Sequence, residues 1–185
     1  MTAIDAMTVA CSVAAASGAV IRLPQGNADK LMRDAKALTA PGADRMISGL
    51  ATMQEIPGFI YVATPYSKWA NAPGLSLSKA ASAAAKLTGE LMAMGIKCYS
   101  PIAHCHYITL NSYLDPLDHR MWMEQCAPMM EAASGCIVLQ LPGWNNSKGV
   151  AEEVAYFSHA SKPVHYVDPC RLLPGYVMPG KEAVH

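Results

Sequence analysis

The sequence predicts an α/β fold, and two observations predict it. Short β-rich runs alternate with helical patterns from residue 59 onward. The run CIVLQL at 136–141 is continuously apolar, which is typical of a strand covered on both faces. Because parallel strands need crossover connections, this alternation favours a parallel sheet of about four or five strands with helices on both faces. That arrangement is Rossmann-like, of the flavodoxin-like kind.

The elements of the first half follow from local patterns. FIYVA at 59–63 is a β-rich run that ends at the loop TPYSKWANAPG. Between 75 and 94 apolar residues recur at helical spacing, and Gly95 stands where a cap residue would close that helix. The run IKCYS at 96–100 predicts a second strand, and 100–118 is expected to be a polar loop.

The second half continues the alternation. A Met-rich helix is expected from about 119 to 133, with its methionines in the core or at a subunit interface. The strand 136–141 precedes a helix over 148–160, for which Ser147 is a suitable N-cap, and 163–167 predicts the last strand. Ligands of open parallel sheets bind beyond the carboxyl ends of the strands, so the site is expected in the loops 64–74, 100–118 and 142–149.

The length of the chain fits one main domain with appended structure. Of its 185 residues, 57–170 form the expected α/β domain and 171–185 a tail. Residues 1–56 are Ala-rich and read as an appended, partly helical segment, with helical patterns near 28–38 and 42–53.

The amino-acid composition limits the kinds of partner that this protein is expected to bind. The 14 Lys and Arg residues balance 14 Asp and Glu residues and form no basic run, so a small molecule is favoured over a nucleic-acid polymer. The 6 cysteines form no CxxC pair, which fits a reducing cytoplasm. No stretch reaches the roughly 20 apolar residues of a membrane span, so no membrane association is expected.

Two adjacent carboxylates in the helix 148–160 are not equivalent. At about 100° per residue, Val150, Val154 and Phe157 define the buried face. Glu153 lies about 60° from the centre of that arc, whereas Glu152 lies nearly opposite it. We therefore expect Glu152 to be a solvated surface residue and Glu153 to face the cleft, where it is either a functional carboxylate or a rim residue paired with a surface cation.

The sequence HCH at 104–106, with the nearby His119, can be drawn as a zinc cluster. Adjacent residues of an extended loop point in opposite directions, however, and no second ligand pair has zinc-like spacing. We therefore expect neither a metal nor a cofactor.

Four motifs occur in an order that resembles a known family. They are IYVATPYS (60–67), YSPIAHCH (99–106), Asp118 followed four residues later by Trp122, and LPGWNNSKGVAEEVAYF (141–157). Together they resemble the nucleoside 2-deoxyribosyltransferase superfamily, in particular a bacterial and phage branch without an assigned function. The resemblance covers about 59–169 and leaves 1–56 unexplained.

The resemblance implies roles for several residues. In a G-x-x-x-E pattern of that superfamily, matched here by Gly149 and Glu153, the glutamate attacks the anomeric carbon of a nucleoside. Tyr61 matches a tyrosine that positions this glutamate. Ser147 stands where nucleotide-hydrolysing relatives carry a phosphate-binding serine and the transferases tend to carry an aspartate, which favours a nucleoside monophosphate. Relatives form dimers whose active sites a neighbouring subunit completes, so a homodimer is expected.

One departure from the family concerns proton transfer. Cys126 aligns with a family aspartate near the substrate, and Ser134 aligns with a second aspartate. A thiol is a poor substitute for a carboxylic acid as a proton donor to the leaving base, so either Asp118 or His104 takes that role or the enzyme is weak.

The resemblance therefore implies an N-glycosidase that hydrolyses or transfers the base of a nucleoside monophosphate or nucleoside, with Glu153, Tyr61 and Asp118 as catalytic residues. Two alternatives stay open: a non-catalytic nucleotide-binding module, favoured by Cys126, and an interaction protein acting through 1–56. Trp122 and Trp144 are either packing residues or platforms for the base. The substrate-binding candidates are Thr64, Pro65, Tyr66, Ser67, Ser100, His104, Trp122, Cys126, Gly143, Trp144, Ser147, Lys148 and Gly149.

Overall fold

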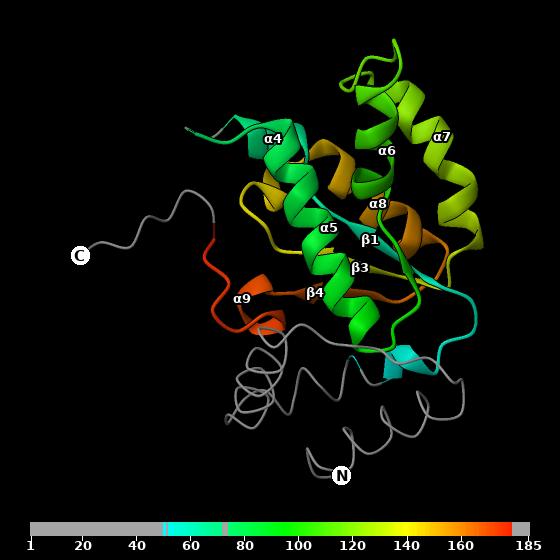
Figure 1. Ribbon diagram of the computed structural model, residues 1–185. Coiled ribbons are helices and arrows are strands. Elements are labelled where there is room, and N and C mark those ends of the chain that lie inside the picture. The colour runs from blue at the N-terminus through cyan, green and yellow to red at the C-terminus, as the bar shows by residue number, and fades with distance from the viewer. Residues whose placement is uncertain (1–49, 51, 72–73, 179–185) are drawn as a thin grey trace, which may run out of the picture. The chain divides into compact units, whose positions relative to one another are not determined.

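A computed structural model describes residues 50, 52–71 and 74–178 of the chain (Figure 1). Its four strands form one sheet in the order β2-β1-β3-β4, and all neighbouring strands are parallel. The strands are β1 (Ile60–Ala63), β2 (Cys98–Tyr99), β3 (Gly135–Leu139) and β4 (Val164–Val167). The predicted Rossmann-like α/β fold is confirmed.

Three long helices cover the two faces of this sheet. In Figure 1, α5 (Leu77–Ala93) crosses in front of the strands, and α8 (Lys148–His159) lies behind them beside α7 (His119–Ala132). The remaining described helices are α4 (Ser67–Ala70), α6 (Pro101–Leu110), the 3-10 turn η1 (Trp144–Asn146) and α9 (Pro169–Leu172).

The alternation of side chains along β1 places its residues on opposite faces. Tyr61 and Ala63 pack in one cluster with Val150 and Phe157 of α8, together with buried residues of β3 and α7. The intervening Ile60 and Val62 therefore face the other side, where α5 buries Ala80, Ala84, Leu87 and Leu91. Tyr61 is consequently the strand residue that points toward the helix carrying Glu153.

The ends of α5 show why the predicted helix forms there. The hydroxyl of Ser76 accepts a 3.2 Å hydrogen bond from the Lys79 N–H at the N-terminus. At the C-terminus, Gly95 has a φ of 83°, which favours glycine, and its N–H donates to the Met92 carbonyl at 2.9 Å. The Ile96 N–H donates to the Leu91 carbonyl at 3.1 Å, which completes a Schellman motif. The predicted cap at Gly95 is confirmed.

The predicted loop over 100–118 is wrong in its first half, where residues 101–110 form α6. Ser100 is the N-cap, and its hydroxyl accepts a 3.3 Å hydrogen bond from the Ala103 N–H. Pro101 follows at the first helical position, where its missing N–H costs nothing. The apolar residues of α6 do not gather on one face, so periodicity did not reveal the helix and only the Ser-Pro pair signalled its start.

The N-terminal predictions fall mostly outside the described residues. The helical pattern at 28–38 lies outside them, and of the pattern at 42–53 only Leu50, 52 and 53 are described, all of them helical. Leu50 and Met53 are buried. The proposed domain boundary at 57 stays a prediction. None of the helices formed by the described residues is long and apolar enough to cross a membrane.

Candidate active site

A cavity of about 320 Å³ lies where the sequence placed the site, at the carboxyl ends of β1 and β3. This is the point at which the strand order reverses, and such switch points are common ligand sites in open α/β sheets. Its volume lies within the range of small-molecule sites. The lining residues come from the segment after β1, from α6, from 116–117, from α7 and from the start of α8.

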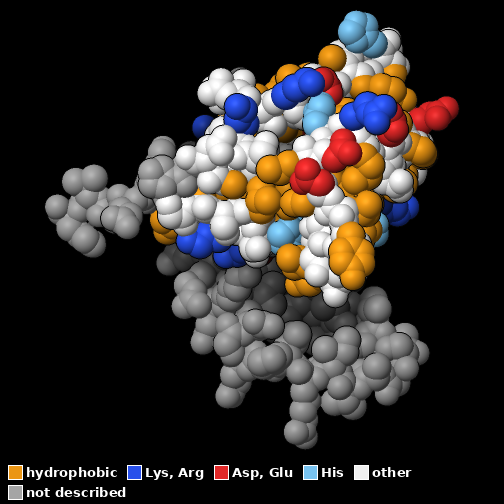
Figure 2. Space-filling view, turned by 90° about the horizontal axis from the view of Figure 1, so that it is seen from above, with side chains coloured by type: hydrophobic (Ala, Val, Ile, Leu, Met, Phe, Trp, Pro, Cys, Tyr) orange, Lys and Arg blue, Asp and Glu red, His pale blue; other side chains and the backbone are white. Residues whose placement is uncertain are grey.

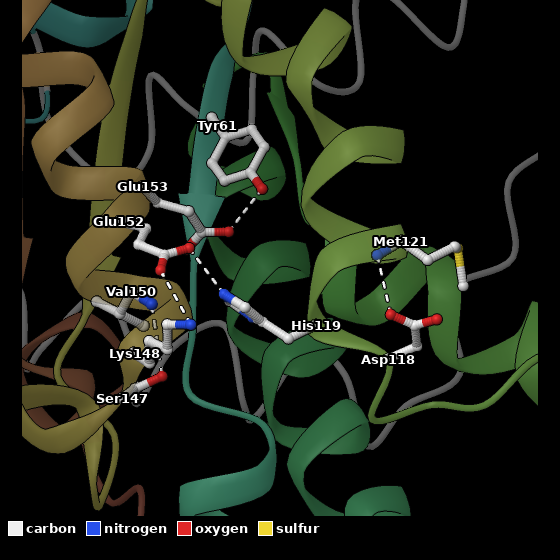
Figure 3. A network of polar contacts seen from close by, with 9 residues as sticks. All are labelled: Tyr61, Asp118, His119, Met121, Ser147, Lys148, Val150, Glu152 and Glu153. Atoms are coloured by element: carbon white, nitrogen blue, oxygen red, sulfur yellow. Dashed lines mark hydrogen bonds and ion pairs between the residues drawn. The ribbon is translucent and has the colours of Figure 1, made fainter.

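Glu153 is held at this cavity by Tyr61. The Tyr61 hydroxyl donates a 2.6 Å hydrogen bond to Oε1 of Glu153, although the two residues are 92 positions apart (Figure 3). Tyr61 is fully buried and Glu153 is 8% exposed. Val150 and Phe157 anchor α8 against the sheet one turn before and one turn after Glu153, so the carboxylate has little freedom to leave the tyrosine.

Burial dominates the electrostatics of this pair. It raises the pKa of Glu153 from its ordinary value of 4.5 to about 8, the Tyr61 hydrogen bond lowers it, and the proximity of Cys126 and Glu152 adds to the rise. Burial, followed by the proximity of Glu153, raises the pKa of the Tyr61 hydroxyl, which therefore remains a neutral donor. The carboxylate consequently changes protonation near neutral pH, which is the range of pKa values typical of functional carboxyl groups.

Polar groups surround the start of α8. The Ser147 hydroxyl is buried and accepts a 3.4 Å hydrogen bond from the Val150 N–H, so the predicted N-cap is confirmed. Ser147 and Gly149 both line the cavity. Across from them Thr64 also lines it, 5% exposed, and its hydroxyl oxygen has no hydrogen-bond partner among the described residues. A buried hydroxyl without a partner is costly, so this group is suited to a ligand.

Glu152 lies at the surface, as the helical wheel predicted, and it is paired there with two neighbouring side chains. Its side chain is 42% exposed, and its Oε2 accepts a 2.7 Å hydrogen bond from Nε2 of His119 (Figure 3). Its Oε1 lies 3.5 Å from Nζ of Lys148. Slight burial raises the pKa of Glu152, but His119 and Lys148 lower it by more, so the carboxylate is stabilised in its ionised form. The wheel correctly placed Glu152 outside the core but gave no sign of the histidine on α7.

The two histidines of the HCH sequence point to different surroundings because α6 is helical rather than extended. His104 is exposed and packs against the ring of Tyr99, with 5.7 Å between ring centroids. His106 is buried, lines the cavity and pairs through Nδ1 with the Tyr66 hydroxyl at 2.7 Å. The cavity histidine of α6 is therefore His106, whereas the sequence favoured His104.

Two cysteines continue the polar chain behind Glu153. Cys126 lies close to the Tyr61 hydroxyl and to Cys105, and both cysteines line the cavity. The interaction with Cys105 and burial raise the pKa of Cys126, whereas the same interaction lowers the pKa of Cys105. Cys126 therefore stays a protonated thiol beside the tyrosine.

The structure brings half of the predicted residues together. The predicted residues that line the cavity are Thr64, Tyr66, Ser67, Trp122, Cys126, Ser147, Gly149 and Glu153, with Tyr61 behind Glu153. The predicted residues outside its lining are Pro65, Ser100, His104, Asp118, Gly143, Trp144 and Lys148.

Local structural roles explain most of these exceptions. Ser100 and Asp118 are N-caps whose side-chain oxygens accept backbone N–H groups of α6 and α7. Gly143 forms a turn with a φ of 84° and lies close to Lys68. Trp144 packs against the ring of Tyr166, with 5.5 Å between centroids. It is therefore a packing residue rather than a platform for a base.

The sequence did not predict several residues that line the cavity. Most of them lie in α6 or in the turn before α7, and the sequence did not reveal that α6 is a helix. His119 was noticed only as a possible metal ligand, although it directly follows the N-cap Asp118. The lining residues absent from the predicted site are Pro101, Ile102, Cys105, His106, Thr109, Pro116, Leu117, His119, Met123 and Val150.

Comparison with known protein families identifies a family for this chain. No curated protein matches the sequence significantly. Residues 58–168, more than half of the chain and all four strands, match a family described as a domain of unknown function, DUF1937. The chain therefore belongs to the DUF1937 family.

Proposed function

We propose that this protein cleaves the N-glycosidic bond of a nucleoside 5′-monophosphate or nucleoside, with Glu153 as the nucleophile. The observation that carries the proposal is the buried Glu153 carboxylate, held by the Tyr61 hydroxyl at 2.6 Å on the wall of the cavity. A carboxylate in this setting can stabilise an oxocarbenium-like transition state or form a glycosyl ester. The four motifs that resemble nucleoside 2-deoxyribosyltransferases support the same reaction, and we propose that the family is a branch of that superfamily.

The cavity walls suit the two ends of such a substrate. Apolar side chains from α6, α7 and the turn before α7 can cover a planar base, and they include Pro101, Ile102, Leu117, Trp122 and Met123. At the start of α8, free backbone N–H groups, Ser147 and the unpartnered Thr64 hydroxyl can bind phosphate oxygens.

The described part of the face shown in Figure 2 gives no support to a polymeric nucleic acid as the ligand. On the face shown in Figure 2, charged side chains of both signs are interspersed with hydrophobic ones. Protein surfaces that grip a phosphate backbone instead carry a concentrated patch of Lys and Arg. A small nucleotide or nucleoside therefore remains the proposed partner.

The proposal is tested by incubating the protein with a panel of nucleosides and their 5′-monophosphates and measuring released base by chromatography. The wild type should release base from at least one member, preferentially a monophosphate. Glu153→Gln should reduce this release by a factor on the order of 10³, since it removes the nucleophile but keeps the shape of the side chain. Glu124→Gln, on the exposed side of α7, is the matched control and should retain activity. No release from any member of the panel would refute the reaction.

A second candidate is a nucleotide-binding module without catalysis. Cys126 favours it, because its thiol replaces a carboxylate of the resembled family and its pKa is raised by Cys105 and by burial. Isothermal titration with the same panel separates the candidates: binding of a monophosphate without release of its base would favour the module.

We also propose a homodimer. The methionines of α7 contribute mainly to the core, with Met130 buried and Met123 and Met129 packed against the main cluster. Exposed apolar side chains instead gather on α6 and the loop after it, beside the cavity, and they are Tyr107, Ile108, Leu110, Tyr113, Leu114 and Leu117. A surface of this kind is typical of a protein–protein contact.

A further inference from the structure

His119 is placed at the cavity by the start of α7. It is the first residue of that helix, and the preceding Asp118 side chain accepts a 3.1 Å hydrogen bond from the Met121 N–H, which fixes the helix start. The imidazole lines the cavity, and its Cε1 would lie 4.0 Å from a Cβ built on Gly149. The ring therefore lies over the first turn of α8, the helix that carries Glu153.

Glu152 orients this ring. Nε2 of His119 donates to Oε2 of Glu152 at 2.7 Å, and Lys148 approaches the second carboxylate oxygen at 3.5 Å (Figure 3). Because Nε2 is occupied, Nδ1 is the nitrogen left for a ligand, and no described residue is hydrogen bonded to it.

The other titratable groups of the cavity are engaged elsewhere. His106 pairs with Tyr66, and Cys105 pairs with Cys126. Glu153 is the nucleophile in the proposed reaction. Asp118 and His104, which the sequence offered as proton donors, do not line the cavity. Among the described lining residues, His119 is the one with both a carboxylate partner and a free nitrogen.

We propose that His119, positioned by Glu152, is the general acid and base of the N-glycosidase reaction. An oxygen of Glu153 bonds to the anomeric carbon as the carbon–nitrogen bond breaks. The electron pair of that bond passes to the base nitrogen, which takes the Nδ1 proton of the His119 imidazolium. Water then attacks the anomeric carbon and gives a proton to Nδ1, and Glu153 leaves as a carboxylate. Nucleotide and water thus become free base and sugar phosphate, and the protein returns to its starting form.

This inference rests on the proposed function, and substrates with different leaving groups test it separately. His119→Gln keeps a donor toward Glu152 but removes the titratable ring. On a substrate of the panel that the wild type cleaves, this variant should lose about 10²- to 10³-fold in kcat/KM. On the matching nitrophenyl 2-deoxyriboside 5′-phosphate, whose leaving group needs no proton, the loss in kcat/KM should be less than about tenfold, because kcat/KM reports the step in which the leaving group departs and only acid catalysis depends on leaving-group basicity.

Three further variants complete the experiment. Glu152→Gln, which removes the charge behind the ring, should show the same selectivity with a smaller loss, and His119→Asn serves as a second replacement of the ring. His159→Gln, at the exposed end of α8, is the control and should match the wild type. Equal losses of His119→Gln on both substrates, or no loss on either, would overturn the assignment. If the wild type and His119→Gln are equally active while Glu153→Gln is inactive, the role of His119 is refuted but the proposed function is not. If the wild type releases no base, both are refuted.

Discussion

The hydroxyl of Tyr61 and the carboxylate of Glu153 form a buried 2.6 Å hydrogen bond between β1 and α8. The tyrosine comes from the centre of the sheet and the glutamate from the second turn of a helix that packs on it. The contact is the innermost part of a chain of polar side chains that continues through Cys126 to Cys105. It explains how one carboxylate can stay in an apolar surrounding and still change protonation near neutral pH.

The pH dependence of catalysis should reflect this pair. Glu153 must be ionised to act as a nucleophile, and burial raises its pKa to about 8. On the nitrophenyl substrate, whose leaving group needs no proton, the value of kcat/KM should therefore rise with pH and level off above about pH 8, because this parameter reports the ionisation of the free enzyme. Tyr61→Phe removes a hydrogen bond that lowers the pKa of Glu153, so the midpoint should move upward. A Tyr61→Phe profile with a lower midpoint than the wild type would contradict this account, and Tyr166→Phe is the control.

Stability should depend on pH in the opposite direction. Folding raises the pKa of Glu153 from 4.5 to about 8, so the fold favours the protonated carboxyl. The resulting stabilisation is complete below about pH 4.5 and is lost as the pH rises through about 8. Glu153→Gln, which is always neutral, should match the wild type near pH 5 and exceed it near pH 9 by a few kcal/mol, since one pKa unit corresponds to about 1.4 kcal/mol. Urea unfolding at both pH values measures the difference, and an equal difference at both would argue against a raised pKa.

Ser147→Asp should reverse the preference for a phosphate. A hydroxyl beside free helix N–H groups attracts a 5′-phosphate, whereas a carboxylate there repels it. The substitution should weaken monophosphate binding by roughly 2 to 4 kcal/mol, about 30- to 1,000-fold, with a much smaller effect on the uncharged nucleoside. Binding isotherms for both ligands provide the measurement, and Ser158→Asp, near the far end of α8, is the control. If the wild type binds both ligands equally, Ser147 is only a cap.

If the protein is the proposed homodimer, sedimentation at micromolar concentration should give a mass twice that of the 19.7 kDa chain. The exposed apolar residues around the end of α6 should mediate it, so Leu110→Ser combined with Tyr113→Ser should shift the protein toward monomer. Val177→Ser removes another exposed apolar side chain outside this region and should leave the mass unchanged. A wild-type protein that sediments only as a monomer would rule out the dimer.

The sequence alone determined the elements whose signals are local. Continuous apolar runs predict buried strands such as β3. Apolar residues at helical spacing, followed by Gly95, predict α5. The same helical geometry separated Glu153 from Glu152, because three apolar positions define which way α8 faces. The sequence did not predict α6, because the apolar residues of this helix lie on all sides. The only local sign of the helix was Ser100 followed by Pro101.

Only the tertiary structure decided which distant side chains meet. Tyr61 reaches Glu153 because β1 lies next to β3 in the sheet, and His119 reaches Glu152 because α7 packs beside α8. His106 lines the cavity in place of the predicted His104 because α6 is helical, and in a helix residues two positions apart point to nearly opposite sides. Such contacts depend on strand order and helix packing, which join segments dozens of residues apart, whereas propensity and periodicity report only on neighbours along the chain.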